Sequence, residues 1–380
     1  MKKKICIISE FCIPYLYGGG EFRYYFLTRE LKKLGHDVTW VCMKFSSQKS
    51  KKEKIGGVDV VHIGPKIRHP PNRSLFQMVH FSLALFFHIL FHRYDVVDAQ
   101  AFIPLIPAWA ASLLKKTRMV ATIHDVSKGK ESQWVKYRSV APYMEKLIYR
   151  FPYRTIITVS DSSRKRLEEL GVSRDRISVV NNGVDLKLVD SVRAPGRKDR
   201  HSVIYVGRLA NNKRLQDLIR AVKLAQKQFP DITLRIIGTG GEMEKLRKLA
   251  QKKKVDAQFF GAVSDEEKFR QLKRSEVFVL PSVREGFGIS LVEAMACRTA
   301  VVGSRVTGIV NVIDEGKTGL FFKARDVKDL AGKIRKLFRD DSLRHKLAEN
   351  GRKKVEKRFR WELKAKKIED IYFNRHETEG

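Results

Sequence analysis

The sequence predicts an α/β protein of two tandem, doubly wound domains, and three observations lead to this prediction. The chain has 380 residues, and a single hydrophobic core rarely grows beyond roughly 250–300 residues. Short apolar runs alternate with helical patterns along most of the chain, which is typical of parallel sheets built from βαβ units. Residues 190–200 interrupt this alternation with Pro195, Gly196 and four cations, which indicates a linker. We therefore expect Rossmann-like domains over residues 1–190 and 201–360.

The first domain opens with an apolar strand, Ile5–Ile8, and a glycine-rich turn, Gly18–Gly20. A helical pattern then runs from Glu21 to about Leu34, and Gly35 is placed to end it. Strand, turn, helix and strand make one βαβ unit. Further strands of this domain are expected at Asp37–Met43, Val96–Val97, Arg118–Ile123, Thr155–Val159 and Ile177–Val180.

The second domain repeats this alternation after the linker. Its expected strands are Val203–Val206, Thr233–Ile237, Ala257–Phe260, Val277–Leu280 and Ala300–Val302, and its expected helices are Leu215–Phe229, Met243–Gln251 and Ile289–Cys297. Doubly wound domains bind ligands at the carboxyl ends of their strands. We therefore expect the active site in the cleft between the two domains.

The segment Leu75–Phe91 is nearly all apolar. We favour a core helix of the first domain. An interfacial membrane-binding helix stays open as an alternative, because cations such as Lys66, Arg68 and Arg93 flank the segment. A spanning helix is the third interpretation, although it needs about 20 apolar residues.

The formal net charge of +34 predicts attraction to an anionic partner, namely membrane lipid, nucleic acid or a phosphorylated acceptor. A general bias of composition would also explain it. The four cysteines form no Cys-x-x-Cys pair, so we expect buried thiols in a reducing compartment. The first apolar stretch is too short for a signal sequence and is followed by Glu10. These features favour the cytoplasm.

Two cations follow the first strand of the second domain, Arg208 in Gly207-Arg208-Leu209 and then Lys213. Fixed cations at the mouth of a sheet suit a diphosphate, whose charge grows as it departs. Solvated surface cations are the alternative in so basic a chain.

Two carboxylates stand around the next strand-to-helix junction, Pro281–Ile289. Glu285 lies in the loop, and Glu293 lies about one turn inside the following helix. The helix start exposes backbone N–H groups. One carboxylate can accept hydrogen bonds from sugar hydroxyls and the other from a ribose diol.

Two features of the first domain are expected on the opposite wall of the same cleft. The Gly18-Gly19-Gly20-Glu21 turn lets the backbone approach a phosphate, although a simple tight turn explains it equally well. His124 ends a central strand and can donate a hydrogen bond or move a proton, or it is a structural histidine. We attribute the spacing of His88 and His92 to coincidence. The chain contains no Asp-x-Asp, so we expect no metal.

Taken together, these segments resemble the group-one (family-four) retaining glycosyltransferases of the GT-B fold. The resemblance covers nearly the whole chain and is strongest from Gly207 to about Gly319. Its most specific element is Glu285-Gly-Phe-Gly through Glu293-Ala-Met-Ala, the family's two glutamates eight positions apart.

The resemblance implies a role for each site residue. Glu285 and His124 would be the catalytic residues, with Glu285 on the donor-sugar hydroxyls and His124 positioning the sugar. The donor-binding set would be Gly19, Gly20, Arg208, Lys213, Phe287, Gly288, Ile289, Ser290 and Glu293. Arg208 and Lys213 would hold the diphosphate, and Glu293 the ribose. The resemblance implies no protein nucleophile, and residues 361–380 would cross back to the first domain.

Several positions depart from the family pattern. Arg214 and Arg298 stand where the family usually has glycine, Ala300 where it has proline, and Asn311 where it has glutamate. None of these is a predicted site residue. They leave the identity of the donor open.

The leading hypothesis is a retaining glycosyltransferase that moves a hexosyl group from a nucleotide-diphosphate sugar, without a metal or other cofactor. The acceptor is unknown, and a lipid-linked or phosphorylated acceptor at the inner membrane face would suit the charge. A nucleotide-sugar epimerase of the same fold is the alternative. A nucleic-acid-binding protein is a remote one, because the chain contains no nucleic-acid module and no nucleic-acid partner is expected.

Overall fold

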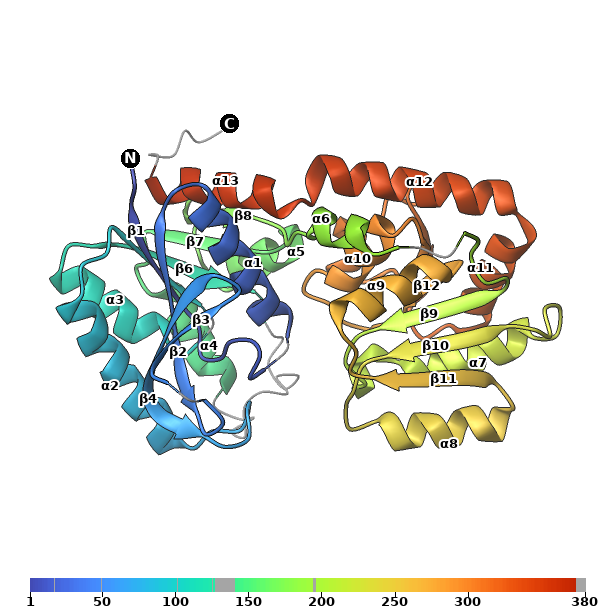
Figure 1. Ribbon diagram of the computed structural model, residues 1–380, viewed down its shortest axis with the longest axis horizontal. Coiled ribbons are helices and arrows are strands. Elements are labelled where there is room, and N and C mark those ends of the chain that lie inside the picture. Colours follow the sequence, from blue (N-terminus) through green and yellow to red (C-terminus); the bar gives the residue numbers. More distant parts are fainter. Residues whose placement is uncertain are drawn as a thin grey trace. The chain divides into compact units, whose positions relative to one another are not determined.

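The computed structural model describes residues 1–16, 18–48, 50–100, 102–124, 126, 141–193 and 196–373, without the side chains of 141–145. Asp125, Pro195 and residues 374–380 of the predicted crossing segment lie outside the described residues. The chain divides into two compact units (Figure 1). Unit 1 comprises Met1–Asn182 and the segment from Trp361 onward, and unit 2 comprises Gly183–Arg360.

Unit 1 contains a sheet with the strand order β3-β4-β2-β1-β5-β6-β7-β8. Its pairings are parallel except for β3 with β4. The central strands are buried along their length, as expected of a sheet covered on both faces. The strands are β1 (Lys4–Ile8), β2 (Asp37–Phe45), β3 (Lys52–Ile55), β4 (Val58–Ile67), β5 (Val96–Gln100), β6 (Arg118–Ile123), β7 (Thr155–Thr158) and β8 (Ile177–Val179).

The helices of unit 1 are α1 (Gly19–Lys33), α2 (Leu75–Phe91), α3 (Leu105–Leu114), α4 (Ala141–Arg150), α5 (Asp161–Glu169) and α13 (Trp361–Phe373). Helix α13 packs on the unit that the chain left long before. The Trp361 ring stacks on Phe26, and the Tyr372 hydroxyl donates to the buried Asp98 carboxylate at 2.5 Å. These contacts fix α13 to unit 1.

Unit 2 contains a parallel sheet with the order β11-β10-β9-β12-β13-β14. The strands are β9 (Ser202–Val206), β10 (Thr233–Ile237), β11 (Asp256–Gly261), β12 (Val277–Leu280), β13 (Ala300–Ser304) and β14 (Leu320–Phe322). The helices are α6 (Leu186–Ser191), α7 (Leu215–Ala225), α8 (Met243–Lys253), α9 (Asp265–Arg274), α10 (Ile289–Ala296), α11 (Val327–Arg339) and α12 (Asp341–Arg358). The prediction of two doubly wound α/β domains is thus confirmed.

The strand order reverses once in each sheet. The reversal lies between β1 and β5 in unit 1 and between β9 and β12 in unit 2. In open parallel sheets, ligands bind outside the carboxyl ends of the strands at such a switch point. Each unit therefore offers one such place by its topology alone.

Unit 2 begins at Gly183, before the predicted linker of residues 190–200. The Val184 N–H donates to the Phe359 carbonyl at 2.7 Å, and Arg352 forms a bidentate ion pair with Asp190 at 2.9 Å. The Lys198 ammonium donates to two backbone carbonyls of unit 2, those of Lys273 and Ser275, both at 2.9 Å. Much of the polar segment is therefore anchored to unit 2, because its charged side chains find partners there that a linker would lack.

Helix α2 has the predicted bounds, but it is a core helix on one face only. Phe81, Leu85 and Ile89 are buried, whereas Phe76 and Phe91 are 73% and 77% exposed. Within the described part of the chain, no helix has both the length and the apolar character needed to cross a membrane.

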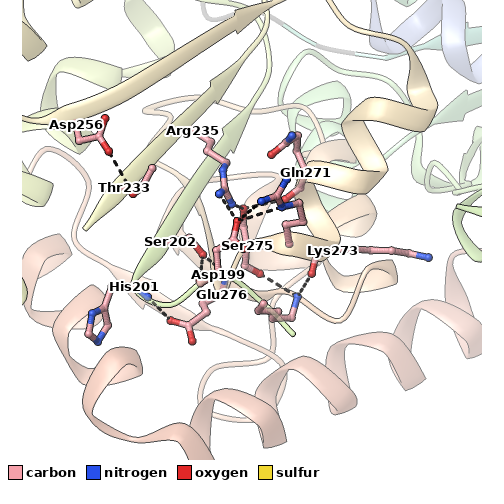
Figure 2. Close-up of polar contacts among 12 residues, drawn as sticks. Asp199, His201, Ser202, Thr233, Arg235, Asp256, Gln271, Lys273, Ser275 and Glu276 are labelled. Carbon is pink, nitrogen blue, oxygen red and sulfur yellow. Dashed lines mark hydrogen bonds and ion pairs between the residues drawn. The ribbon is translucent and has the colours of Figure 1, made fainter. Parts of the chain in front are cut away.

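A buried polar network joins the amino-terminal ends of strands in unit 2 (Figure 2). The Glu276 carboxylate accepts from the His201 N–H at 2.9 Å and from the Arg344 guanidinium at 2.8 Å. Arg235 donates to Ser275 at 3.2 Å and pairs with Asp199. The network lies at the end of the sheet opposite the carboxyl ends of the strands, where ligands bind, so we assign it a structural role.

Replacing Glu276 by alanine should lower the free energy of unfolding by about 3 kcal/mol, because it removes the buried carboxylate partner of Arg344 and leaves that guanidinium with only the exposed Asp341 carboxylate. Urea denaturation measures this. The exposed Lys245–Glu242 pair supplies the control, and Lys245→Ala should change stability by about 0.5 kcal/mol or less. Equal effects of the two substitutions would contradict the structural role of the network.

Candidate functional site

Lys213 and Glu285 lie together at the switch point of unit 2. The Lys213 Nζ is 2.5 Å from the Glu285 Oε1, and the Ser282 hydroxyl donates to the same oxygen at 2.7 Å. The Val283 N–H donates to the Asn212 carbonyl at 2.9 Å and so ties the loop after β12 to the turn that carries Lys213. Two predicted site residues, 72 positions apart, are therefore held by one arrangement.

Arg208 follows β9 at the same end of the sheet. The Tyr205 hydroxyl donates to the Arg208 carbonyl at 3.0 Å, and the neighbouring loop after β10 packs closely against this turn. Gly238 makes that approach possible, because its φ is 129° and a Cβ there would lie 2.0 Å from the Gly207 carbonyl oxygen. Burial, followed by the Glu285 charge, raises the pKa of Tyr205, whereas Arg208 lowers it. The charges of Arg208 and Glu285 thus both influence the pKa of the buried Tyr205 hydroxyl.

Helix α10 begins beside this cluster, at Ile289. Its N-cap, Gly288, has a φ of 85° and, as a glycine, forms no side-chain capping hydrogen bond. The first backbone N–H groups of a helix lack intrahelical acceptors and carry a partial positive charge. The amides of Ile289 and Ser290 therefore suit an anion. The Phe287 side chain is buried against Phe359, with ring centroids 5.6 Å apart, which fixes the approach to the helix.

Glu293 lies on α10 but pairs with a cation that sequence reasoning missed. Its Oε1 accepts from Lys268 of α9 at 2.7 Å, and Lys268 also donates to Asp265 at 2.7 Å. Burial lowers the Lys268 pKa, but Glu293 and Asp265 together raise it above its ordinary value. Nothing in the sequence distinguishes Lys268 from the many other lysines of the chain.

The predicted residues of unit 1 gather at its own switch point. His124 follows β6, and its Nε2 lies 3.0 Å from the Gln100 Oε1 and 3.1 Å from the Tyr24 hydroxyl. Gly19 and Gly20 open α1, and a Cβ on Gly20 would lie 3.5 Å from the same Gln100 oxygen. The structure thus brings Gly20 and His124 together through Gln100.

Gln100 and Tyr24 were missed in the sequence. Gln100 is the last residue of β5, beside β1 at the switch point. A polar residue that ends an apolar parallel strand is the signal that could have found it. Tyr24 is fully buried inside α1 and packs edge-on against the His124 ring, and no spacing in the sequence predicts that contact.

His124 is held in its neutral form. Burial, and then the nearby Arg23 charge, lower the pKa of His124 from its ordinary value near 6.5 to about 3. A neutral ring with its proton on Nε2 donates toward Gln100. The ring can therefore position a hydroxyl group, but it is not charged near neutral pH.

Acidification should reveal this lowered pKa. The pKa of His124 is near 6.5 in the unfolded chain and about 3 in the folded chain. Between these pH values only the unfolded chain binds the proton, so the contribution of His124 to the free energy of unfolding is highest above pH 6.5 and decreases as the pH falls. His124→Gln should therefore lose about 1–2 kcal/mol less stability than wild type between pH 7.5 and pH 5. Urea denaturation at both pH values checks this, with the exposed His80→Gln as control. An unchanged pH dependence in His124→Gln would oppose a neutral His124.

Two departures from the family pattern lie at positions whose backbone favours glycine. Arg214 has a φ of 55° and Arg298 a φ of 51°, both in the left-handed region that favours glycine. Arg214 forms two hydrogen bonds with Asp217, at 2.8 and 3.0 Å. Both positions therefore have a left-handed backbone although they carry arginine.

The cysteines and the pair His88 and His92 lie outside both clusters of site residues. The four cysteines are buried and free. Within the described part of the chain, Cys12, Cys42 and His62 offer ligand atoms within 4.8 Å of one another. His62 is engaged by the Met43 carbonyl at 2.9 Å and by Glu53 at 2.5 Å. His88 contacts the Tyr94 hydroxyl at 3.0 Å, and His92 contacts the His88 carbonyl at 2.8 Å. That the reaction requires no metal stays a prediction.

The site residues thus form two clusters, one at each switch point. Arg208, Lys213, Glu285 and the start of α10 belong to unit 2, whereas Gly19, Gly20 and His124 belong to unit 1. Their meeting in one cleft stays a prediction.

Both halves of the chain match glycosyltransferase families. The family described as "Glycosyl transferases group 1" matches residues 190–354, and "Glycosyltransferase Family 4" matches residues 17–188. The chain is 30% identical over 286 residues to a glycogen synthase of Mycobacterium tuberculosis, covering 74% of this chain and 69% of that protein. It is 31% identical over 274 residues to a phosphatidyl-myo-inositol mannosyltransferase of Mycobacterium leprae, covering 71% of this chain and 70% of that one.

Solved structures share the fold at lower identity. Sucrose-phosphate synthase from Thermosynechococcus elongatus superposes with a TM-score of 0.83 at 23% identity, over 98% of both chains. HepE of Anabaena in complex with UDP-glucose superposes with a TM-score of 0.77 at 18% identity, over 97% of this chain and 99% of that one. The architecture is accordingly that of the GT-B glycosyltransferases.

These matches do not support the alternative of a nucleotide-sugar epimerase, since both family descriptions name glycosyltransferases. The clusters at the switch points occupy the segments that these families match. The chain therefore belongs to the group 1, family 4 glycosyltransferases and is a glycosyltransferase.

Proposed function

We propose that this enzyme transfers a hexosyl group from a nucleotide-diphosphate sugar to an acceptor with retention of the anomeric configuration. One observation carries the proposal, namely the Lys213–Glu285 pair beside the uncapped start of α10. It places a cation, a carboxylate and free amides at one switch point. In a sugar diphosphate, the sugar hydroxyls can donate to the carboxylate, and the negative phosphates can accept from the cation and the amides.

The diphosphate would lie on the positive part of this cluster. Arg208, Lys213 and the N–H groups of Ile289 and Ser290 would neutralise it, and this charge compensation matters most as the sugar departs. Glu285 would accept hydrogen bonds from the sugar hydroxyls, with Lys213 holding the carboxylate in place. Glu293, fixed by Lys268, would accept from the ribose diol.

The reaction would proceed on one face of the sugar. The bond from the anomeric carbon to the diphosphate oxygen breaks while the acceptor oxygen bonds to the same face of that carbon. The acceptor proton passes to the departing phosphate oxygen, so no protein base is required, and the direct attack on the same face requires no protein nucleophile. A neutral His124 would orient the sugar rather than supply a proton.

For the acceptor, we propose a lipid-linked or phosphorylated molecule at the inner face of the cell membrane, with the enzyme in the cytoplasm. The net charge of +34 supports an anionic partner. The mannosyltransferase relative is named for a phospholipid, phosphatidyl-myo-inositol, whereas the other relative is named for glycogen. The net charge supports an acceptor of the first, anionic kind.

Donor screening followed by product analysis tests the proposal. A panel of nucleotide sugars should contain one that raises the melting temperature, because a ligand of the folded state stabilises it. NMR of the product made from that donor should show the anomeric configuration of the donor. An inverted product would overturn the mechanism, and stabilisation by no nucleotide sugar would overturn the donor assignment.

A further inference from the structure

Helix α2 presents a second apolar face, which points away from the core. This α2 face is defined by Phe76, Val79, Leu83, Phe87 and Phe91, which are 73%, 51%, 56%, 50% and 77% exposed. Their spacing of three, four, four and four residues follows one side of a helix. Single exposed apolar residues are ordinary, but a contiguous stripe of large ones marks an interaction surface.

The helix does not need this face for its own stability. Phe81, Leu85 and Ile89 are buried on the opposite side, where α2 packs against α3 and β4. Ser74 and Gln77 form a capping box at its start. Apolar side chains on the α2 face therefore contribute little to folding.

Helix α3 carries two further exposed apolar residues near one end of α2. Figure 1 shows α2 and α3 side by side. The Lys115 ammonium donates to the His92 carbonyl at 2.6 Å, and these residues are the C-caps of α3 and α2, so the ends of the two helices lie close together. Leu113 and Leu114, just before Lys115, are 62% and 67% exposed.

The charge around this surface is positive. Helix α2 contains no acidic residue. Exposed cations lie near both ends of α2. Lys66 in β4 and Arg68, just after β4, precede the helix, and Arg93 and Lys116 lie near its end. An apolar stripe with cations at its margins fits an anionic lipid surface, in which the apolar groups enter the acyl boundary and the cations meet phosphates.

We infer that the α2 face is the surface by which this enzyme docks on an anionic membrane. The inference adds a location to the proposed function and rests on it only for the reason to dock, namely access to a lipid-linked acceptor. Apolar burial and charge would both contribute, so binding should weaken with salt but not vanish.

Sedimentation of the full-length enzyme with vesicles tests this inference. Vesicles of phosphatidylglycerol and phosphatidylcholine should bind the wild type, and vesicles of phosphatidylcholine alone should bind it far less. Leu83→Ser with Phe87→Ser should reduce binding about tenfold or more, because both side chains lose their apolar contact with lipid. Leu147→Ser changes an apolar residue of α4 that is 64% exposed and should leave binding unchanged.

A matched pair of charge reversals separates this face from the general charge of the chain. Lys66→Glu with Arg68→Glu should weaken vesicle binding strongly, whereas Lys252→Glu with Lys253→Glu, the same charge change on exposed positions of α8, should weaken it much less. Equal effects would mean that net charge alone binds lipid and would overturn the inference.

Three further outcomes have a defined meaning. If light scattering shows a dimer that Leu83→Ser with Phe87→Ser dissociates, the face binds a second copy and the inference is wrong. Calorimetric binding of the nucleotide sugar should be unchanged in that variant. Loss of vesicle binding with donor binding intact supports the docking face. Wild-type failure to bind vesicles, with transfer intact, removes the docking face and leaves the proposed function standing.

Discussion

Glu285→Gln should reduce turnover by about 10²–10³ while the nucleotide still binds. The carboxylate at this position accepts from Ser282 and pairs with Lys213. The amide keeps the shape but loses the charge that strengthens hydrogen bonds to sugar hydroxyls as the transition state forms. Lys213 would then lose its carboxylate partner and become more available to phosphate. Affinity for the nucleoside diphosphate should therefore be equal or higher.

Steady-state kinetics and calorimetry measure the two quantities separately. Glu349→Gln is a suitable control, since Glu349 is 52% exposed and pairs with Arg298 on the surface of the same unit. It should transfer sugar at the normal rate. A normal rate in Glu285→Gln would show that this cluster is not the active site.

Arg208→Ala should weaken donor binding and turnover together, each by about tenfold or more. A guanidinium can bind phosphate oxygens in a bidentate manner, and the charge on the diphosphate grows as the sugar leaves. Arg208→Lys keeps the charge without the planar fork and should recover only part of the activity.

Arg220→Ala provides the comparison for Arg208. Arg220 is an arginine of unit 2 that is 49% exposed and lies 3.6 Å from Asp217. Its loss should leave donor affinity within about twofold of wild type. If Arg208→Ala binds the donor normally, the diphosphate lies elsewhere.

Much of the fold could be predicted because strand periodicity is a local property. The runs at Thr233–Ile237 and Val277–Leu280 became strands with the predicted bounds. The hairpin of β3 and β4 was missed, because β3 is a short, charged edge strand whose apolar pattern is weak. The predicted helix from Leu215 ends at Ala225 rather than Phe229.

The site could be predicted where it depends on one loop and not where it depends on tertiary pairing. Glu285 and the start of α10 lie within five residues of sequence, so their proximity is local. The partners Lys268 and Gln100 come from other elements, α9 and β5. Their roles depend on which helices and strands are neighbours in the fold, and no single segment of the sequence determines that arrangement.

Helix α2 illustrates the same limit. Its bounds follow from its composition, but a helix that is nearly all apolar does not reveal which side faces the core. Only the packing against α3 and β4 separates Phe81 and Leu85 from the exposed Leu83 and Phe87. The core and interfacial interpretations of the sequence were therefore not exclusive.

A crystal structure of the enzyme with a nucleoside diphosphate tests the central claim most directly. We predict that the diphosphate oxygens lie within hydrogen-bonding distance of the Ile289 and Ser290 N–H groups and of Lys213, at the carboxyl ends of β9 and β12. A diphosphate bound at any other place on unit 2, with this cluster unoccupied, would contradict the account.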